Sequence, residues 1–515
     1  MKTDKIIVTN GNALREKYGP EGLAAIREAM AAMIEADGKR HITTRVVFTD
    51  RHNDMRPYGR LIRGPATPST QKAAIDAIYD VDKPDYLMIL GAQDVVPFQV
   101  LANPLWDPKH PDEDDRWVES DLPYACDAPF SRDINDFVGP IRVVGRLPDL
   151  VGATDPAYLL RIMRIAMRAK TRKSGDYQSC FTLSAQKWQA STAMSLRAIY
   201  QHSSRLLTTP QAGPNWPAKR LSPRIHFINC HGGWNESTYY GEANKHPKDA
   251  PLPRAHTASW LARKIVEGAV LAAECCYGAQ LYDPEMTENQ AGIAYTYLFE
   301  GAYGVFGSST IAYGPYSGND SADLITQMFL AQVLHGASLG RAALEAWQGF
   351  AGKWSHLNPE HLKTLGQFYL LGDPSLHPVA MTARSFDKTK VFKDAFKYTH
   401  DAGPRKLRRE KLLRIGRSIE REVPRTVKAP GARMSKPLDL IMRRSARESG
   451  MGRFSVRHYR VEPKLRAPLI VRVKRTVHVI IQSRHRAKGG PPDVTLISAT
   501  AENGRIVHIR RMHSR

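Results

Sequence analysis

A histidine and a cysteine each follow a short apolar run in the middle of the chain. The run 225–230 leads into His231-Gly232-Gly233, and the run 270–275 ends on Cys275. Such runs predict buried strands, and parallel strands end on one edge of a sheet, where ligand sites form. A thiolate can attack a carbonyl carbon while an imidazole passes a proton to the leaving amine. The pair therefore predicts peptide-bond cleavage by a Cys-His dyad made of His231 and Cys275.

The glycine after the histidine has a role in the same chemistry. Gly232 lets the backbone approach a substrate closely, and its N–H could bind a developing oxyanion together with the N–H of Cys275; such a donor contributes about 3 kcal/mol. The position of the nucleophile is open by one residue. Cys275 is favoured because it directly follows the strand-end residue Glu274, and Cys276 is the alternative.

Apolar runs alternate with amphipathic stretches through the first 380 residues, which predicts an α/β fold with a largely parallel sheet. The expected strands are 45–48, 86–90, 141–144, 180–184, 225–230, 270–275 and 304–308, and the expected helices include 21–36, 71–79 and one that begins at 154–156.

At these residues the sequence resembles the caspase-like cysteine peptidases of clan CD, and within the clan it is most similar to the gingipain family. The supporting segments are Phe227–Gly232, Leu271–Cys275, Cys275–Gly278, Gly307–Thr310 and Leu371–Leu376, with Asp121–Tyr124 and Val144–Pro148 upstream. The likeness runs from about residue 40 to 380. It implies a caspase-haemoglobinase-like three-layer sandwich and cysteine endopeptidase activity. Cys275 fits the Cys-x-x-Gly spacing of gingipains, whereas Cys276 fits the Cys-x-Gly spacing of caspases.

The resemblance also suggests roles for two carboxylates. Asp176 lies near where related lysine-specific gingipains place the group that orients the histidine, although it could simply form a turn. Asp320 resembles the aspartate that lines a pocket for a basic P1 side chain, although it could simply cap a helix. Trp188 and Trp234 are close to these segments and could shape subsites or pack against the sheet.

Charge separates the chain into two parts. The whole chain carries a net charge of +23, and residues 381–515 hold 35 Lys and Arg against 11 Asp and Glu, so the excess belongs to this tail. We expect an N-terminal α/β subdomain over 1–152, a caspase-like catalytic domain over 153–380, a basic helical linker over 381–436 and a small basic β-rich domain over 437–515. The tail strands are expected at 454–461, 469–482 and 493–511.

The basic tail allows several functions. It could bind nucleic acid through phosphate contacts, bind an acidic protein or an anionic membrane surface, act as an inhibitory or processing segment, or pack beside the catalytic unit as the downstream β-sandwich of gingipains does.

Other features narrow the class of protein. No long apolar run, signal peptide or zinc-type Cys/His spacing is visible, so we expect a cytoplasmic protein with reduced cysteines, no metal and no cofactor. The acidic residues 112–115 are expected to form a solvated loop rather than a calcium site. The sequence thus favours a cysteine endopeptidase that cleaves after Arg or Lys and is regulated by its tail. The alternative is a catalytically silent caspase-fold scaffold whose tail binds nucleic acid or an acidic partner.

Overall fold

The structure is a computed structural model. It describes residues 3–110, 112–203, 206–210, 212–245, 250–380, 405–452, 454–463, 473–484 and 490–515, with the side chains of 405–408 left out.

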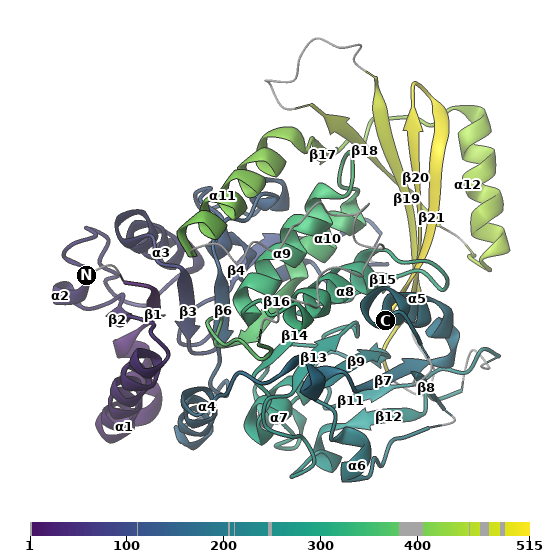
Figure 1. The fold of residues 1–515 in the computed structure, drawn as a ribbon. Helices are drawn as coiled ribbons and strands as arrows, with labels where there is room; N and C mark the ends of the chain where they lie inside the picture. The colour runs from purple at the N-terminus through teal and green to yellow at the C-terminus, as the bar shows by residue number, and fades with distance from the viewer. Residues whose placement is uncertain are drawn as a thin grey trace.

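A ten-stranded sheet runs through the molecule in the order β2-β1-β3-β6-β16-β14-β13-β9-β7-β8 (Figure 1). All neighbours are parallel except β14 and β16, which are antiparallel, so the sheet consists of two parallel halves that run in opposite directions. Its strands are β1 (Lys5–Thr9), β2 (Thr44–Phe48), β3 (Tyr86–Leu90), β6 (Val144–Leu147), β7 (Cys180–Ala185), β8 (Leu206–Thr209), β9 (Ile225–Asn229), β13 (Val270–Ala273), β14 (Gly304–Ser308) and β16 (Phe368–Gly372).

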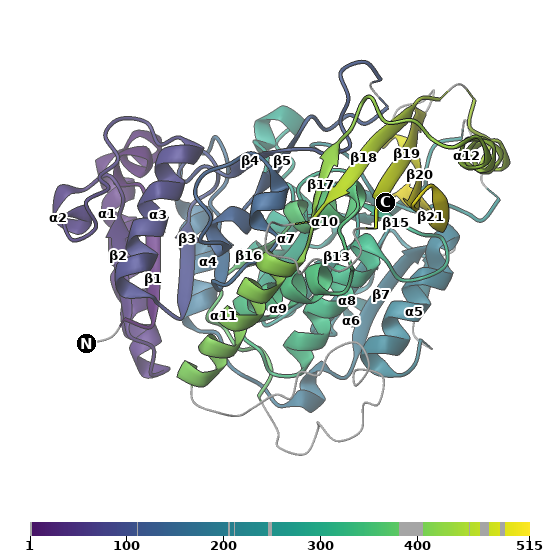
Figure 2. The same cartoon turned by 90° about the horizontal axis from the view of Figure 1, so that it is seen from above.

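Helices cover both faces of this sheet. They are α1 (Gly11–Lys39), α2 (His52–Met55), α3 (Pro68–Asp82), α4 (Ala157–Met167), α5 (Gln189–Tyr200), α6 (Ala218–Leu221), α7 (Ile293–Glu300), α8 (Ser321–Leu334), α9 (Leu339–Gly352) and α10 (Pro359–Gln367). Helices α1, α4 and α7 pack in a row on one face, while α5, α8 and α9 pack on the other (Figures 1 and 2). The predicted α/β fold with a largely parallel sheet is therefore confirmed.

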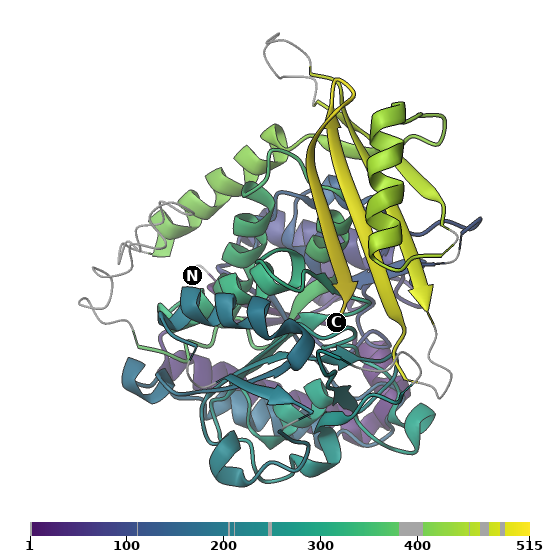
Figure 3. The same cartoon turned by 90° about the vertical axis from the view of Figure 1, so that its right-hand side faces the viewer.

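The second large sheet brings the tail and the body together. It has six antiparallel strands in the order β15-β21-β20-β19-β18-β17, made from β15 (Tyr313–Gly314), β17 (Arg425–Lys428), β18 (Val456–Glu462), β19 (Arg475–Arg484), β20 (Asp493–Glu502) and β21 (Arg505–Ser514). Helix α12 (Lys436–Glu448) covers one face of this sheet, and α11 (Arg405–Glu422) lies against α9 (Figures 2 and 3). Strand β15 comes from the body of the chain, so the body contributes the edge strand of the sheet that the tail builds. Residues 381–404 of the predicted linker and 469–472 of a predicted strand lie outside the described residues.

The remaining strands are short. They are β4 (Gln99–Ala102), β5 (Trp117–Ser120), β10 (His231–Gly232), β11 (Thr238–Tyr240) and β12 (Arg254–Thr257). None of the helices within the described residues is both long and apolar enough to cross a membrane. All five cysteines are buried, and none of them forms a disulfide.

The acidic segment 112–115 differs from the solvated loop expected for it. Glu113 is fully buried, and the Lys363 Nζ lies 2.5 Å from its carboxylate and 2.9 Å from that of Asp115. Two of the four carboxylates therefore hold Lys363, a residue of α10, because a buried lysine needs carboxylate partners.

Another buried ion pair ties the first strand to the end of β16. The Lys5 Nζ lies 2.5 Å from the Asp373 carboxylate and 3.0 Å from that of Asp37, and all three side chains are almost completely buried. Because a partner removed from such a cluster leaves unpaired charges in the core, the pairing is costly to break.

We predict that Lys5→Met lowers the free energy of unfolding by about 3–5 kcal/mol. Lys39→Met, on the exposed end of α1, is the matched control and should change it by less than about 0.5 kcal/mol. Urea unfolding followed by circular dichroism measures both. Equal midpoints for the two variants would contradict the assigned role of Lys5.

Candidate active site

The site is built where β9 and β13 end side by side. The two strands are parallel neighbours in the register Val270↔Ile225 to Ala273↔Ile228. Past their ends the backbones converge so closely that a Cβ at position 232 would lie 1.9 Å from the Cys276 carbonyl oxygen. Only glycine fits there, and His231 is therefore held beside the two cysteines.

The backbone carbonyl of Arg515 occupies this junction. It accepts hydrogen bonds from the N–H of Gly232 at 3.3 Å and from the N–H of Cys276 at 3.1 Å. We expected the Cys275 N–H to be the second oxyanion donor, whereas the N–H that meets the Arg515 carbonyl is that of Cys276. The β9–β13 ladder continues to Glu274, whose N–H bonds the Ile228 carbonyl, so Cys276 is the residue whose N–H is aimed at the junction.

The two cysteines have different surroundings. The Cys275 sulfur is fully buried and lies 3.8 Å from the Ile228 carbonyl oxygen, on the core side. The Cys276 sulfur faces the β15 segment, where it accepts the Ala312 N–H at 3.3 Å and lies 3.5 Å from the Ala312 carbonyl oxygen. Burial raises the pKa of Cys275 well above its ordinary value. Burial also raises the pKa of Cys276 to about 12, and the hydrogen bond from the Ala312 backbone opposes that shift.

The His231 imidazole is oriented by a carboxylate that the sequence analysis missed. Its Nε2 lies 2.7 Å from Glu242 Oε2, and Lys187 lies 2.8 Å from the other carboxylate oxygen. Burial opposes the charge on Glu242, but hydrogen bonding and attraction from His231 and then Lys187 hold the pKa of that carboxyl well below its ordinary value. The Trp188 ring packs against the imidazole with centroids 4.4 Å apart.

Asp176, predicted for this role, lies elsewhere. It is exposed in a 3-10 turn, Ser174–Tyr177, that precedes β7. The sheet edge before β7 is opposite to the edge where β9 and β13 end, so Asp176 cannot orient His231.

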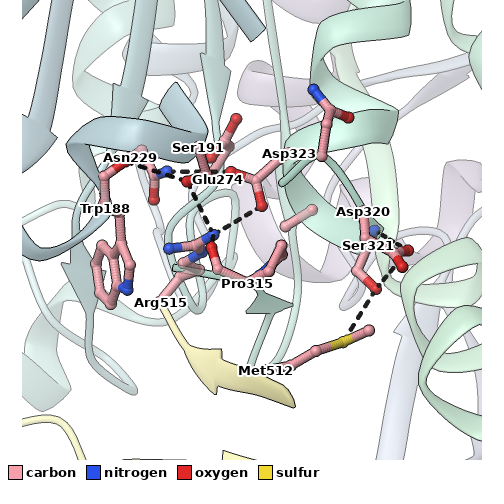
Figure 4. Close-up of polar contacts among 12 residues, drawn as sticks. Trp188, Ser191, Asn229, Glu274, Pro315, Asp320, Ser321, Asp323, Met512 and Arg515 are labelled. Carbon is pink, nitrogen blue, oxygen red and sulfur yellow. Dashed lines mark hydrogen bonds and ion pairs between the residues drawn. The ribbon is translucent and has the colours of Figure 1, made fainter. Parts of the chain in front are cut away.

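A closed pocket holds the guanidinium of Arg515 (Figure 4). Its Nη2 donates to Asp323 Oδ2 at 2.7 Å and to the Pro315 carbonyl at 2.8 Å, with Ser191 Oγ at 3.4 Å. The guanidinium carbon lies 4.6 Å from the centroid of the Trp188 ring, a cation–π contact.

A second buried carboxylate, that of Glu274, lies close to Asp323. Burial and then the Asp323 carboxylate raise the pKa of Glu274 well above its ordinary value. The carboxylate that contacts the guanidinium is that of Asp323. The pocket wall needs a glycine at 314, since a Cβ there would lie 2.3 Å from the Arg515 Nη2.

Asp320, predicted to line the pocket, has another role. Its side chain caps α8 through the Ser321 N–H, and its carboxylate pairs with His361 and with Arg510, each at 3.0 Å. The carboxylate in the pocket is Asp323, one helical turn further on.

The two tryptophans expected near the site differ in burial. Trp234 is 62% exposed, whereas Trp188 lines the site.

The loop behind Cys276 is fixed by the acidic segment. Asp115 accepts the Ile311 N–H and the Tyr277 O–H, both at 2.8 Å. Lys363 holds Asp115 in turn, so a buried charge network supports the residues that flank the sulfur. Within the described residues, no group of three or more His, Cys, Asp or Glu side chains is arranged to hold a metal ion.

A histidine, two cysteines and two converging N–H groups lie at the ends of parallel strands between helical layers, an arrangement that suits the chemistry of a caspase-like cysteine peptidase. The chain belongs to peptidase family C25, whose family model matches residues 3–379. The resemblance to the gingipain family is thereby confirmed, and the protein is a cysteine peptidase.

Comparison with solved structures gives weak likenesses. A structure described as that of a protease covers 99% of this chain and 97% of its own, with 13% identity and a TM-score of 0.44. The separase–securin complex of Saccharomyces cerevisiae matches 46% of this chain over 14% of the other, with 13% identity and a TM-score of 0.30. No curated protein matches the sequence.

We predict that Glu242→Gln lowers kcat/KM by roughly 100-fold, within the range contributed by a positioned acid or base, because the charge that orients His231 is lost. Asp176→Asn is the control and should leave kcat/KM unchanged. Both are measured on a fluorogenic peptide that ends in Arg. The reverse pattern would return the orienting role to Asp176.

Proposed function

We propose that this protein is an endopeptidase that cleaves after Arg, with Cys276 as nucleophile and His231 as the proton donor to the leaving group. The single observation that carries the proposal is the position of Arg515. Its carbonyl lies between two N–H donors while its guanidinium fills a buried acidic pocket. An arginine held at both ends in this way has the binding mode expected of a P1 residue.

The reaction follows from these positions. His231, oriented by Glu242, takes the proton of the Cys276 thiol, and the thiolate attacks the carbonyl carbon of the P1 arginine. The C=O electron pair moves onto an oxyanion bound by the N–H groups of Gly232 and Cys276. His231 then gives its proton to the leaving nitrogen as the C–N bond breaks. Water attacks the thioester and passes a proton to His231, the thiolate leaves, and the acid product is released. The nucleophile's own N–H commonly forms part of an oxyanion hole, and this favours Cys276 over Cys275.

The pocket favours arginine over lysine. The guanidinium packs against the Trp188 ring, and a planar, delocalised guanidinium stacks on an aromatic face better than the compact, strongly hydrated ammonium of a lysine does. We therefore propose arginine as the main P1 residue.

The other predictions for the tail stay open. Binding of nucleic acid or of an acidic protein to 381–515, a cytoplasmic location, and the four-part domain division remain predictions. A salt titration of nucleic-acid binding by the full chain would test the first of these.

We predict that Cys276→Ala abolishes hydrolysis of the Arg-ending peptide, whereas Cys275→Ala, a change in the core beneath the site, keeps at least about a tenth of it. Full activity in Cys276→Ala with none in Cys275→Ala would assign the nucleophile to Cys275. If neither variant nor the wild type cleaves any peptide, the silent-scaffold alternative stands.

We further predict that Asp323→Asn lowers kcat/KM for Arg substrates by roughly 100-fold, because a buried guanidinium loses its carboxylate at a cost of about 3 kcal/mol. Asp320→Asn should have less than a tenth of that effect. If the two effects are exchanged, Asp320 is the pocket residue.

A further inference from the structure

We propose that residues 513–515 of this chain are an intramolecular ligand that fills subsites P3 to P1 of its own active site and keeps the enzyme closed. The proposal rests on the proposed function, because it takes the Arg515 pocket as the P1 site. It adds the identity of the occupant and the regulation of the site.

The segment binds as an added β-strand. Strand β21 pairs antiparallel with β15 in the register Tyr313↔Ser514 and Gly314↔His513, and the Arg515 N–H donates to the Ala312 carbonyl at 2.9 Å. An extended peptide that adds a strand to a sheet edge is a recurring mode of peptide recognition, in which backbone bonds give affinity and pockets give specificity. Here β15 is that edge, and the Arg515 pocket is the specific subsite.

The two residues before Arg515 are also specifically held. The His513 ring stacks on Tyr316 with centroids 3.7 Å apart. The Ser514 hydroxyl donates to the Pro492 carbonyl at 3.0 Å and accepts the Val494 N–H at 2.9 Å. Tyr316 belongs to the body of the enzyme, whereas Pro492 and Val494 belong to the tail. The tail therefore contacts the segment on one side, and the active site contacts it on the other.

The tail sheet delivers the segment to the site. Strand β21 pairs antiparallel with β20 along most of its length and runs down to the end labelled C, beside the body of the molecule (Figure 3). The tail is fastened to the body away from the site: Arg457 donates to the Leu105 and His110 carbonyls at 2.6 Å, and Arg425 pairs with Asp133 and Asp136. Because these contacts tether the segment, its effective concentration at the site is on the order of millimolar or higher.

Occupation closes the site to solvent and substrate. Arg515 is fully buried, and Cys276 and His231 are almost completely so. The carbonyl and guanidinium of Arg515 fill the positions that a substrate P1 residue would need. A substrate can therefore bind only after the end of β21 has moved.

The test compares Arg515→Ala with Arg511→Ala in the full chain. Arg511 is exposed on the same strand, so the control removes the same charge outside the site. Two readouts are needed: the rate at which a small alkylating agent modifies Cys276, and kcat/KM on the Arg-ending peptide. Thermal unfolding checks that each variant is folded.

We expect Arg515→Ala to raise both the alkylation rate and kcat/KM by about tenfold or more, as for loss of a tethered ligand of sub-millimolar affinity. Arg511→Ala should change neither. A free peptide with the sequence of residues 510–515 should inhibit the activated variant competitively, and the same peptide with Ala in place of Arg515 should not. If Arg515→Ala unfolds, the same two peptides are tested on a variant that lacks residues 513–515.

The outcomes separate the two proposals. Faster alkylation without any peptidase activity would leave the self-occupied site standing and overturn the proposed function. Wild-type activity that depends on Cys276, with no gain of either readout in Arg515→Ala and no inhibition by the peptide, would overturn the intramolecular ligand and leave the peptidase intact.

Discussion

The close approach of two backbones at the ends of β9 and β13 is the constraint on which the site depends. No side chain fits at position 232 against the Cys276 carbonyl, so His231 and Cys276 are brought together by the sheet itself and by a glycine. The same contact turns the N–H groups of Gly232 and Cys276 toward one point. Parallel pairing supplies the alignment, since it places the ends of neighbouring strands on one edge. The chemistry therefore arises from backbone geometry before any side-chain contact is considered.

Buried charged side chains orient the His231 imidazole and bind the Arg515 guanidinium in its pocket. The Glu242 carboxylate contacts both His231 and Lys187, and the Asp323 carboxylate contacts the Arg515 guanidinium. Burying these groups is tolerated because each is paired, and removal of any one would strand its partner in a medium of low dielectric constant. The network of Lys363 and Asp115 extends the same principle to the loop behind Cys276.

Much of this could be predicted from the sequence. Most of the apolar runs predicted strands at the correct places, β3 and β14 to the residue, and the order of short motifs pointed to the right family. The strand expected at 141–144 was placed three residues too early, since β6 is Val144–Leu147. Which cysteine N–H would meet the Arg515 carbonyl could not be predicted. That depends on the residue at which the β9–β13 pairing stops, and the sequence does not show that residue. Glu242 and Asp323 were missed because long-range packing, rather than local spacing, brings them to His231 and Arg515. The β1 strand was also missed, since Ile6-Ile7-Val8 is too short to stand out before its pairing with β2 and β3 is known.

The tail changes meaning once its end is located. Its excess of Lys and Arg suggested that it binds nucleic acid. One of its arginines, Arg515, instead occupies the active site as a substrate would, at the end of a strand that pairs with β15. The most direct test of the whole account is to treat the Arg515→Ala protein with a peptidyl-arginyl electrophile and to map the modified residue by mass spectrometry. The account predicts a single adduct on Cys276. An adduct on Cys275, or no adduct on a folded protein, would contradict it.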